Sequence, residues 1–213
     1  MKKIVEKYSL AKEIIDTKSF FQLFDTAKES LELMQFLSEE EKARAAKITH
    51  PKRKNAFIIA HALSRILLEQ EKALKKAPLS FGTYKKPYLN NALFFNISYA
   101  KDICAIAISN KEIGIDIAQI EPINPLPLEF LHKDELALLQ KSSKIYEDFL
   151  YMWTYKEAVA KAIGVGVNFD FSAINSLKKH FCYKNNLLKI KHKSITLRQK
   201  RYIVAVAMME ELA

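Results

Sequence analysis

The sequence predicts an α+β fold in which helices and antiparallel strands follow one another twice along the chain. From Pro51 towards Lys76, apolar residues recur at helical spacing, whereas from Pro78 the spacing changes to that of short strands joined by turns. A second set of helices, followed by further strands, comes after residue 112. We therefore expect two halves, 1–111 and 112–213, each an antiparallel sheet packed with helices.

Length and composition fit a folded protein with an anionic partner. The chain has 213 residues, of which 49% are hydrophobic, so it can bury a sizeable core. It carries 34 Lys and Arg residues against 24 Asp and Glu residues, which gives a formal charge of +10. This excess does not choose among nucleic acid, a membrane surface, a phosphorylated cofactor and an acidic protein.

Two features predict a location in the cytoplasm. Cys104 and Cys182 lie in strand-like apolar surroundings without a second Cys or a His at metal-ligand spacing, so we expect buried free thiols in a reducing compartment. The longest strong apolar run, from Tyr202 to Met209, is too short to span a bilayer, and charges interrupt the N-terminus. We expect neither export nor membrane insertion.

Local signals predict the elements of the first half. Ser38 and Glu41 form a capping box, so a helix should begin near residue 39. Pro51 opens a longer helix that should end near Lys76. The strand-like segments that follow are 79–84, 93–98 and 103–109, with turns near 85–91 and 100–102.

The second half begins with a strand around 113–120. The only proline-dense stretch follows, from Glu121 to Pro127, and then two helices near 128–140 and 145–163. A final set of strands ends in 202–209, and Asn185-Asn186 is the expected hairpin turn.

Two isolated acids carry the chemical interest of the sequence. In a helix over 149–166, Trp153, Glu157 and Lys161 share one stripe, and about forty residues earlier Asp116 interrupts an apolar strand. Each has a structural explanation when taken alone. Glu157 and Lys161 could form a surface ion pair, Trp153 could belong to the core, and Asp116 could lie on an exposed sheet face.

The order of the motifs changes this interpretation. Along the chain they are Lys86-Pro87, Phe95-Asn-Ile-Ser98, Gly114-Ile-Asp-Ile117 and Trp153-Thr-Tyr-Lys-Glu157, with Lys161 and Gly164 after the last. This series resembles the 4′-phosphopantetheinyl transferases, specifically the long, monomeric branch of the surfactin-synthetase-activating type. The resemblance covers roughly residues 38–170, and its Trp-x-x-Lys-Glu-x-x-x-Lys segment is the specific part.

The resemblance implies a fold and an activity. The fold is a pseudo-dimer of two similar halves, with coenzyme A in the cleft between them and the metal site at their interface. The activity is transfer of the 4′-phosphopantetheine arm of coenzyme A to a serine of an apo acyl or peptidyl carrier protein, which releases 3′,5′-ADP. Mg²⁺ as cofactor, an acidic carrier protein as partner and a monomeric state follow from the same resemblance, with no nucleic acid or membrane involved.

The resemblance also assigns roles to individual residues. Asp116 and Glu157 are the expected metal ligands, because carboxylate oxygens suit Mg²⁺. Glu157 is expected to orient or deprotonate the attacking serine as well, and Lys161 to contact the pyrophosphate and stabilise the leaving group. The expected coenzyme contacts are Arg44 at the 3′-phosphate, Lys86 presented by Pro87, Ser98, Tyr99 and Lys161, with Lys42, Arg53 and Arg65 as weaker candidates.

Two positions depart from the family pattern. Tyr99 stands where the family usually has His, and it cannot become a cation near neutral pH. Ala118 stands where the long branch usually has a third carboxylate, which leaves two acids and another water. Glu121 and Gln119 are no obvious substitutes, because their odd offsets from Asp116 point them to the other face of a regular strand.

These departures keep a second possibility open, a catalytically degenerate homologue that only binds coenzyme A or a carrier protein. A third, a basic nucleic-acid-binding protein, is favoured by the charge alone and lacks zinc-finger spacing, an aromatic ribonucleoprotein motif and a Gly-rich phosphate loop. For the carrier protein, Leu128, Phe130 and Leu131 are the expected docking residues, with Lys133 beside them. Core packing explains the three apolar residues equally well.

Overall fold

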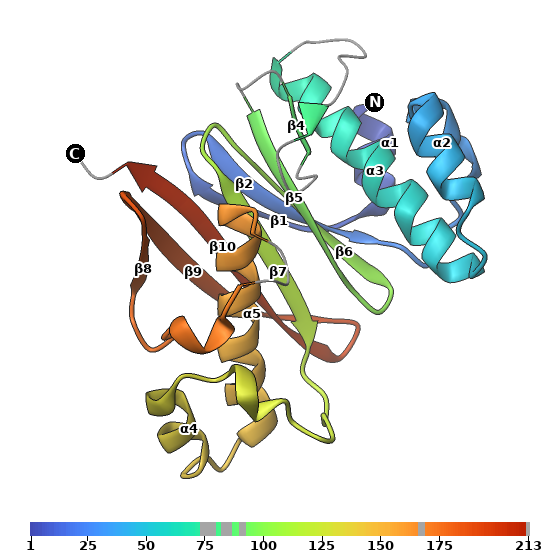
Figure 1. Cartoon of the computed structure of the whole chain (residues 1–213). Helices are drawn as coiled ribbons and strands as arrows, with labels where there is room; N and C mark the ends of the chain where they lie inside the picture. The colour runs from blue at the N-terminus through green and yellow to red at the C-terminus, as the bar shows by residue number, and fades with distance from the viewer. Residues whose placement is uncertain (73–79, 82–86, 90–92, 166–168, 212–213) are drawn as a thin grey trace. The chain divides into compact units, whose positions relative to one another are not determined.

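The structure is a computed structural model, and it describes residues 1–72, 80–81, 87–89, 93–165 and 169–211. It confirms the predicted α+β class, with two sheets and their helices. The chain forms two compact units, of which unit 1 comprises residues 1–80 and 87–110 and unit 2 comprises residues 81–86 and 111–213 (Figure 1). No helix in the described residues is long and apolar enough to cross a membrane.

Unit 1 contains a six-stranded sheet with the order β1-β2-β6-β5-β4-β3. Its strands are β1 (Ser9–Asp16), β2 (Ser19–Asp25), β3 (Ser80–Phe81), β4 (Pro87–Leu89), β5 (Leu93–Ala100) and β6 (Ile103–Ser109). Its helices are α1 (Lys2–Tyr8), the 3-10 helix η1 (Leu31–Phe36), α2 (Glu39–Ala46) and α3 (Pro51–Lys72). The core of this unit joins buried α3 residues such as Leu63 and Ile66 to sheet residues such as Phe24 and Ile106.

Helices α2 and α3 begin where the sequence predicts, whereas α1 and the 3-10 helix η1 were not predicted. Ser38 accepts a hydrogen bond from the Glu41 backbone, and the Glu41 side chain accepts one from the Ser38 backbone, which completes the capping box of α2. Helix α3 begins at Pro51 as expected and is described as far as Lys72; its expected end near Lys76 lies outside the described residues. The predicted strand at 79–84 and the turn near 85–91 lie largely outside them as well.

The hairpin formed by β1 and β2 is not among the predicted elements, so the expected order of helices and then strands was incomplete for this half. Strand β1 is an edge strand with alternating partly exposed and exposed positions, which gives a weak apolar signal. Strand β2 is buried along its whole length, and its run Phe20-Phe21-Gln22-Leu23-Phe24 was a usable strand signal.

Unit 2 contains a four-stranded antiparallel sheet with the order β7-β10-β9-β8. Its strands are β7 (Ile113–Gln119), β8 (His180–Tyr183), β9 (Asn186–Leu197) and β10 (Lys200–Glu211). Between β7 and β8 lie the 3-10 helix η2 (Leu128–Phe130), α4 (Lys133–Leu139), α5 (Ile145–Ile163) and the 3-10 helix η4 (Phe171–Ala173). Helix α5 packs along the sheet against β7 and β10 (Figure 1).

Helix α5 has the predicted bounds because its ends carry clear signals. Glu147 and Asp148 lie in the first turn and Lys161 in the last, which suits the helix dipole, and Gly164 ends the helix with a φ of 71°. Two smaller predictions were wrong. The hairpin turn falls at Lys184-Asn185, since Asn186 already pairs with Tyr183, and Cys182 is exposed on β8, whereas Cys104 is buried and both thiols are free.

Candidate active site

Gly114 lets helix α5 rest directly against strand β7. A Cβ atom built on this glycine would lie 2.1 Å from the carbonyl oxygen of Ala158 and 2.4 Å from the backbone nitrogen of Ala162. No other residue fits there without moving the helix, because real Cβ atoms do not come this close to backbone. The contact brings the end of α5 beside Asp116, which follows Gly114 by two residues and shares its sheet face.

Asp116, Glu157 and Lys161 meet at this contact. The Lys161 ammonium donates to Asp116 Oδ1 at 2.6 Å, and it lies 4.0 Å from Glu157 Oε2. The side chains of Asp116, Glu157 and Lys161 are 10%, 24% and 26% exposed, so each is mostly shielded yet open to solvent on one side. All three come from unit 2. The structure therefore brings two acids from distant parts of the chain to one cation.

The electrostatics of Glu157 reflect this crowding. Partial burial is the main factor that raises the pKa of Glu157 above its ordinary value. The Lys161 ammonium lowers the pKa, and the Asp116 carboxylate, a like charge, raises it again. The two carboxylates are thus close enough to repel each other, and a cation between them relieves that repulsion.

The donor set fits a small divalent cation with oxygen ligands. Two carboxylates that already reach one ammonium can supply two of the six positions of Mg²⁺, and phosphate oxygens and water can fill the others. A third acid is absent from this group in the described part of the chain, where no cluster of three His, Cys, Asp or Glu side chains occurs. Ala118, on the same face of β7 as Asp116, packs against apolar residues, and Glu121 accepts a hydrogen bond from Gln119 at 3.2 Å.

Trp153 belongs to an aromatic cluster rather than to the group of charged side chains. Its ring centroid lies 5.6 Å from that of Phe130, 5.6 Å from that of Phe171 and 6.0 Å from that of Phe149. Such distances are those of packed aromatic pairs. The core explanation of Trp153 is therefore the one that the packing supports.

The coenzyme contacts expected from unit 1 lie on two elements. Arg44 is exposed on α2, with its guanidinium carbon 5.2 Å from the centroid of the Phe57 ring. On β5, Ser98 is buried and Tyr99 is 45% exposed. Lys86 lies outside the described residues, and Pro87 is the first residue of β4, although its side chain is not described.

The weaker cationic candidates differ in their surroundings. Lys42 pairs with Glu39 at 2.7 Å on the surface of α2, and Arg53 is exposed. The Arg65 Nε donates to the buried Glu41 carboxylate at 2.6 Å, and His61 approaches the other oxygen of that carboxylate at 3.1 Å. Arg65 therefore has a structural partner that joins α3 to α2.

Sequence reasoning missed the residue next to Glu157. Lys156 and its partner Glu135 are both fully buried, and their charged atoms lie 2.8 Å apart. Lys156 lies on an apolar helix among residues such as Tyr155 and Ala158. This position could have predicted a buried lysine with a charged partner, because a buried Lys needs one. The partner itself, 21 residues earlier on another helix, has no local signal.

Comparison with known proteins shows a similarity to one family. Residues 112–207 match the pattern of the 4′-phosphopantetheinyl transferase superfamily. This stretch includes Gly114, Asp116, Glu157 and Lys161. The chain is 37% identical over 87 residues to the 4′-phosphopantetheinyl transferase gsp of Aneurinibacillus migulanus, in an alignment that covers 39% of this chain and 37% of that protein.

Two further relatives align over more of the chain. The 4′-phosphopantetheinyl transferase ffp of Bacillus subtilis is 28% identical over 156 residues, or 70% of this chain and 69% of its own. The 4′-phosphopantetheinyl transferase HetI of Nostoc sp. is 27% identical over 149 residues, or 64% of this chain and 63% of its own. The chain thus spans between about a third and about two thirds of the length of these relatives, and its residues 112–207 match the 4′-phosphopantetheinyl transferase superfamily.

Proposed function

We propose that this protein transfers the 4′-phosphopantetheine arm of coenzyme A to a serine of an apo acyl or peptidyl carrier protein and releases 3′,5′-ADP. The observation that carries the proposal is the convergence of Asp116, Glu157 and Lys161, within a region that matches the superfamily. The three relatives named above are 4′-phosphopantetheinyl transferases by name, which favours an active enzyme over a nucleic-acid-binding protein.

We assign Asp116 and Glu157 as the ligands of Mg²⁺. When bound, the ion would neutralise charge on the pyrophosphate of coenzyme A during transfer. The support for this assignment is that both carboxylates already reach one cation, the Lys161 ammonium. Because Ala118 supplies no third carboxylate, we expect weaker metal binding than a three-acid site would give.

We assign two positions to Lys161, one before and one after coenzyme binding. Without coenzyme its ammonium pairs with Asp116, which keeps two repelling carboxylates together. When the pyrophosphate arrives, Lys161 turns to a phosphate oxygen and stabilises the negative charge that develops on the leaving group. A long, partly exposed lysine side chain can make this move without a change in the backbone.

Glu157 has a second task in this proposal. It orients the carrier serine hydroxyl and accepts its proton, directly or through a water molecule, as the hydroxyl oxygen attacks phosphorus. Besides Lys161, we propose the coenzyme contacts expected from the sequence. These are Arg44 at the 3′-phosphate, Lys86 with Pro87, Ser98 and Tyr99. Of these, Arg44 and Tyr99 are exposed, as a contact with a bound phosphate requires.

The proposed partner is an acidic carrier protein, because the chain carries a formal charge of +10. Leu128 and Phe130, in the 3-10 helix before α4, are exposed and suit a docking surface with Lys133. The prediction for Leu131 was wrong, because this side chain is only 3% exposed and belongs to the core. We further propose that the protein acts as a monomer in the cytoplasm.

The decisive test is incubation of an apo-carrier protein with coenzyme A, Mg²⁺ and this protein, followed by mass spectrometry of the carrier. Active protein adds the mass of the phosphopantetheine arm, and Glu157→Gln protein adds none at the same protein concentration. Binding of coenzyme A without modification of acyl and peptidyl carriers would support the degenerate homologue instead. Chelation of divalent ions should abolish the mass change, and added Mg²⁺ should restore it.

A further inference from the structure

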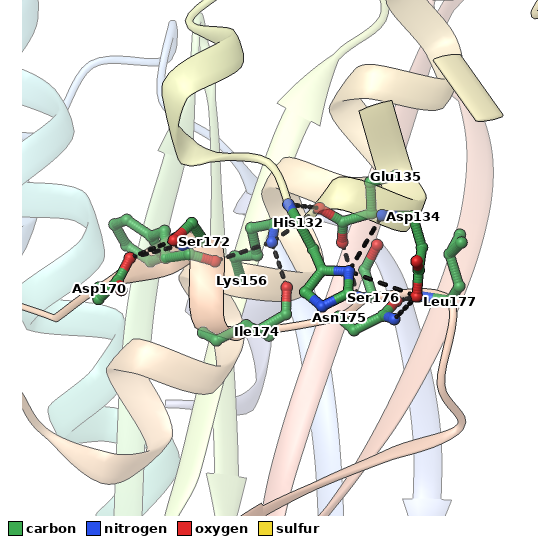
Figure 2. A network of polar contacts seen from close by, with 11 residues as sticks. His132, Asp134, Glu135, Lys156, Asp170, Ser172, Ile174, Asn175, Ser176 and Leu177 are labelled. Carbon is green, nitrogen blue, oxygen red and sulfur yellow. Dashed lines mark hydrogen bonds and ion pairs between the residues drawn. The ribbon is translucent and has the colours of Figure 1, made fainter. Parts of the chain in front are cut away.

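A closed polar network surrounds Lys156, the residue before Glu157. Consecutive residues of a helix point about 100° apart, so these two side chains leave α5 on different sides. The Lys156 ammonium contacts Glu135 Oε2 at 2.8 Å and donates to the carbonyl oxygens of Phe171, at 2.8 Å, and Ile174 (Figure 2). An ammonium has three protons, and each of them has an acceptor here.

Glu135 is equally well held. Its Oε2 accepts a hydrogen bond from the His132 backbone at 2.7 Å, which is the capping bond of α4, and its Oε1 accepts one from the Ser176 backbone at 2.7 Å. Both oxygens are therefore in use besides the ion pair. Lys156 and Glu135 together join three separate segments, which are the start of α4, helix α5 and the chain from Phe171 to Ser176.

Neighbouring bonds hold the same segments in place. Asn175 donates to Asp134 at 2.8 Å and accepts from the Leu177 backbone at 3.0 Å, while Asp170 caps η4 through Ser172 (Figure 2). Helix α5 thus has a firm contact on each of two sides. Gly114 of β7 presses on Ala158 and Ala162, and the Glu135 network holds Lys156.

Glu157 and Lys161 lie on the stretch of α5 that these two contacts define. A small rotation or shift of the helix would move both of them relative to Asp116, whose strand is fixed in the sheet. Lys156 itself is fully buried and its ammonium is held by Glu135 and two carbonyl oxygens, so it is not available to bind a phosphate. Its charge has a partner, and the effect of that pair on the site has to pass through the helix.

We propose that Lys156 is a positioning residue, which sets the rotation and axial position of α5 so that Glu157 and Lys161 face Asp116. The proposal rests on the proposed transfer function. The competing explanation is that the ion pair only stabilises unit 2. The two explanations predict different activities for variants that lose thermal stability while keeping the Lys156–Glu135 pair, or that regain it without the pair.

The test compares four variants in the full chain, well below each melting temperature. Lys156→Met removes the ammonium, Glu135→Gln keeps the shape of the carboxylate and removes its charge, and the double variant removes both charges. Leu63→Ala is the control, since Leu63 is a fully buried residue of α3 and belongs to the core of unit 1, which contains no α5 residue. The readouts are Mn²⁺ affinity by electron paramagnetic resonance without coenzyme, kcat and KM for transfer, and Tm.

For Lys156→Met we expect about a hundredfold loss of kcat, the cost of misplacing reacting groups by an ångström, and about a tenfold loss of Mn²⁺ affinity, with a smaller change in coenzyme KM. Glu135→Gln should move both quantities in the same direction by about tenfold. The double variant should recover Tm, because no unpaired charge is left buried, yet keep the low kcat. Leu63→Ala should lower Tm and leave Mn²⁺ affinity unchanged.

Wild-type kcat and Mn²⁺ affinity in folded Lys156→Met would overturn the proposal, as would a double variant in which kcat recovers together with Tm. A Leu63→Ala protein that loses Mn²⁺ affinity in proportion to its Tm would overturn it too. If Lys156→Met does not fold, Glu135→Gln decides, and an unchanged kcat there would refute positioning. Failure of the wild-type protein to bind Mn²⁺ or modify any carrier would instead refute the proposed function.

Discussion

Substitution of Gly114 by alanine tests whether the approach of α5 to β7 creates the site. The new Cβ would lie 2.1 Å from the Ala158 carbonyl oxygen, whereas ordinary van der Waals contact begins at 3.4 Å. The nearest atoms are backbone atoms of α5 and cannot turn aside, so α5 has to move by more than about 1 Å, a shift that can cost about a hundredfold in rate. Overpacking of this kind destabilises a protein by about 1–3 kcal/mol.

The assay for Gly114→Ala combines Tm, Mn²⁺ affinity and the rate of carrier modification. We expect Tm to fall by several degrees, the modification rate to fall about a hundredfold and the Mn²⁺ affinity to fall with it. Gly164→Ala is the matched control, because its φ of 71° makes alanine unfavourable by about 1–2 kcal/mol without adding an atom between α5 and β7. Gly114→Ala protein with wild-type Mn²⁺ affinity and rate would show that the close approach does not create the site.

Three further predictions concern single side chains. Lys161→Ala should bind Mn²⁺ about tenfold more tightly without coenzyme, because the Lys161 ammonium that repels the ion from Asp116 is gone. The variant should nevertheless modify the carrier more slowly. Weaker Mn²⁺ binding in a titration would contradict the two positions proposed for Lys161. Ala118→Glu should raise Mg²⁺ affinity in calorimetry by at least about tenfold, and an unchanged affinity would place residue 118 outside the coordination sphere. Burial lowers the pKa of His192, on strand β9, to about 4, below its ordinary 6.5, so the stability that the neutral imidazole contributes is complete above pH 6.5 and is lost as the pH falls towards 4. Between pH 6.5 and 4 the Tm of His192→Phe should therefore fall less than that of the wild-type protein. An equal fall in Tm would refute the lowered pKa of His192.

The sequence was informative where one segment contains its own signal. Helix α5 combines an apolar face with acids at its start and a terminal glycine, and its predicted bounds were correct. Strand β1 has none of these signals, because an edge strand needs only one partner and tolerates charges along its length. Its presence follows from pairing with β2, which is a tertiary contact.

The site shows the same division between local and tertiary information. The motifs singled out Asp116, Glu157 and Lys161, and these three side chains do come together. Which carboxylate holds Lys161 depends on how closely α5 approaches β7, and that distance is set by the missing side chain at Gly114. The partner of Lys156 could not be predicted either, since Glu135 already satisfied a local pattern as the capping residue of α4.

The two lysines of α5 differ in burial, and this difference separates a structural role from a proposed catalytic one within one motif. Lys156 is fully buried, and all three of its protons have protein acceptors, so an exchange of partner would leave a charge unpaired in the interior. Lys161 is 26% exposed and lies between two carboxylates that a metal ion could equally well neutralise. Only Lys161 can therefore give up its partner for a phosphate at small cost. The offset of five positions between these lysines on the helix turns one charge towards the core and the other towards Asp116 and Glu157.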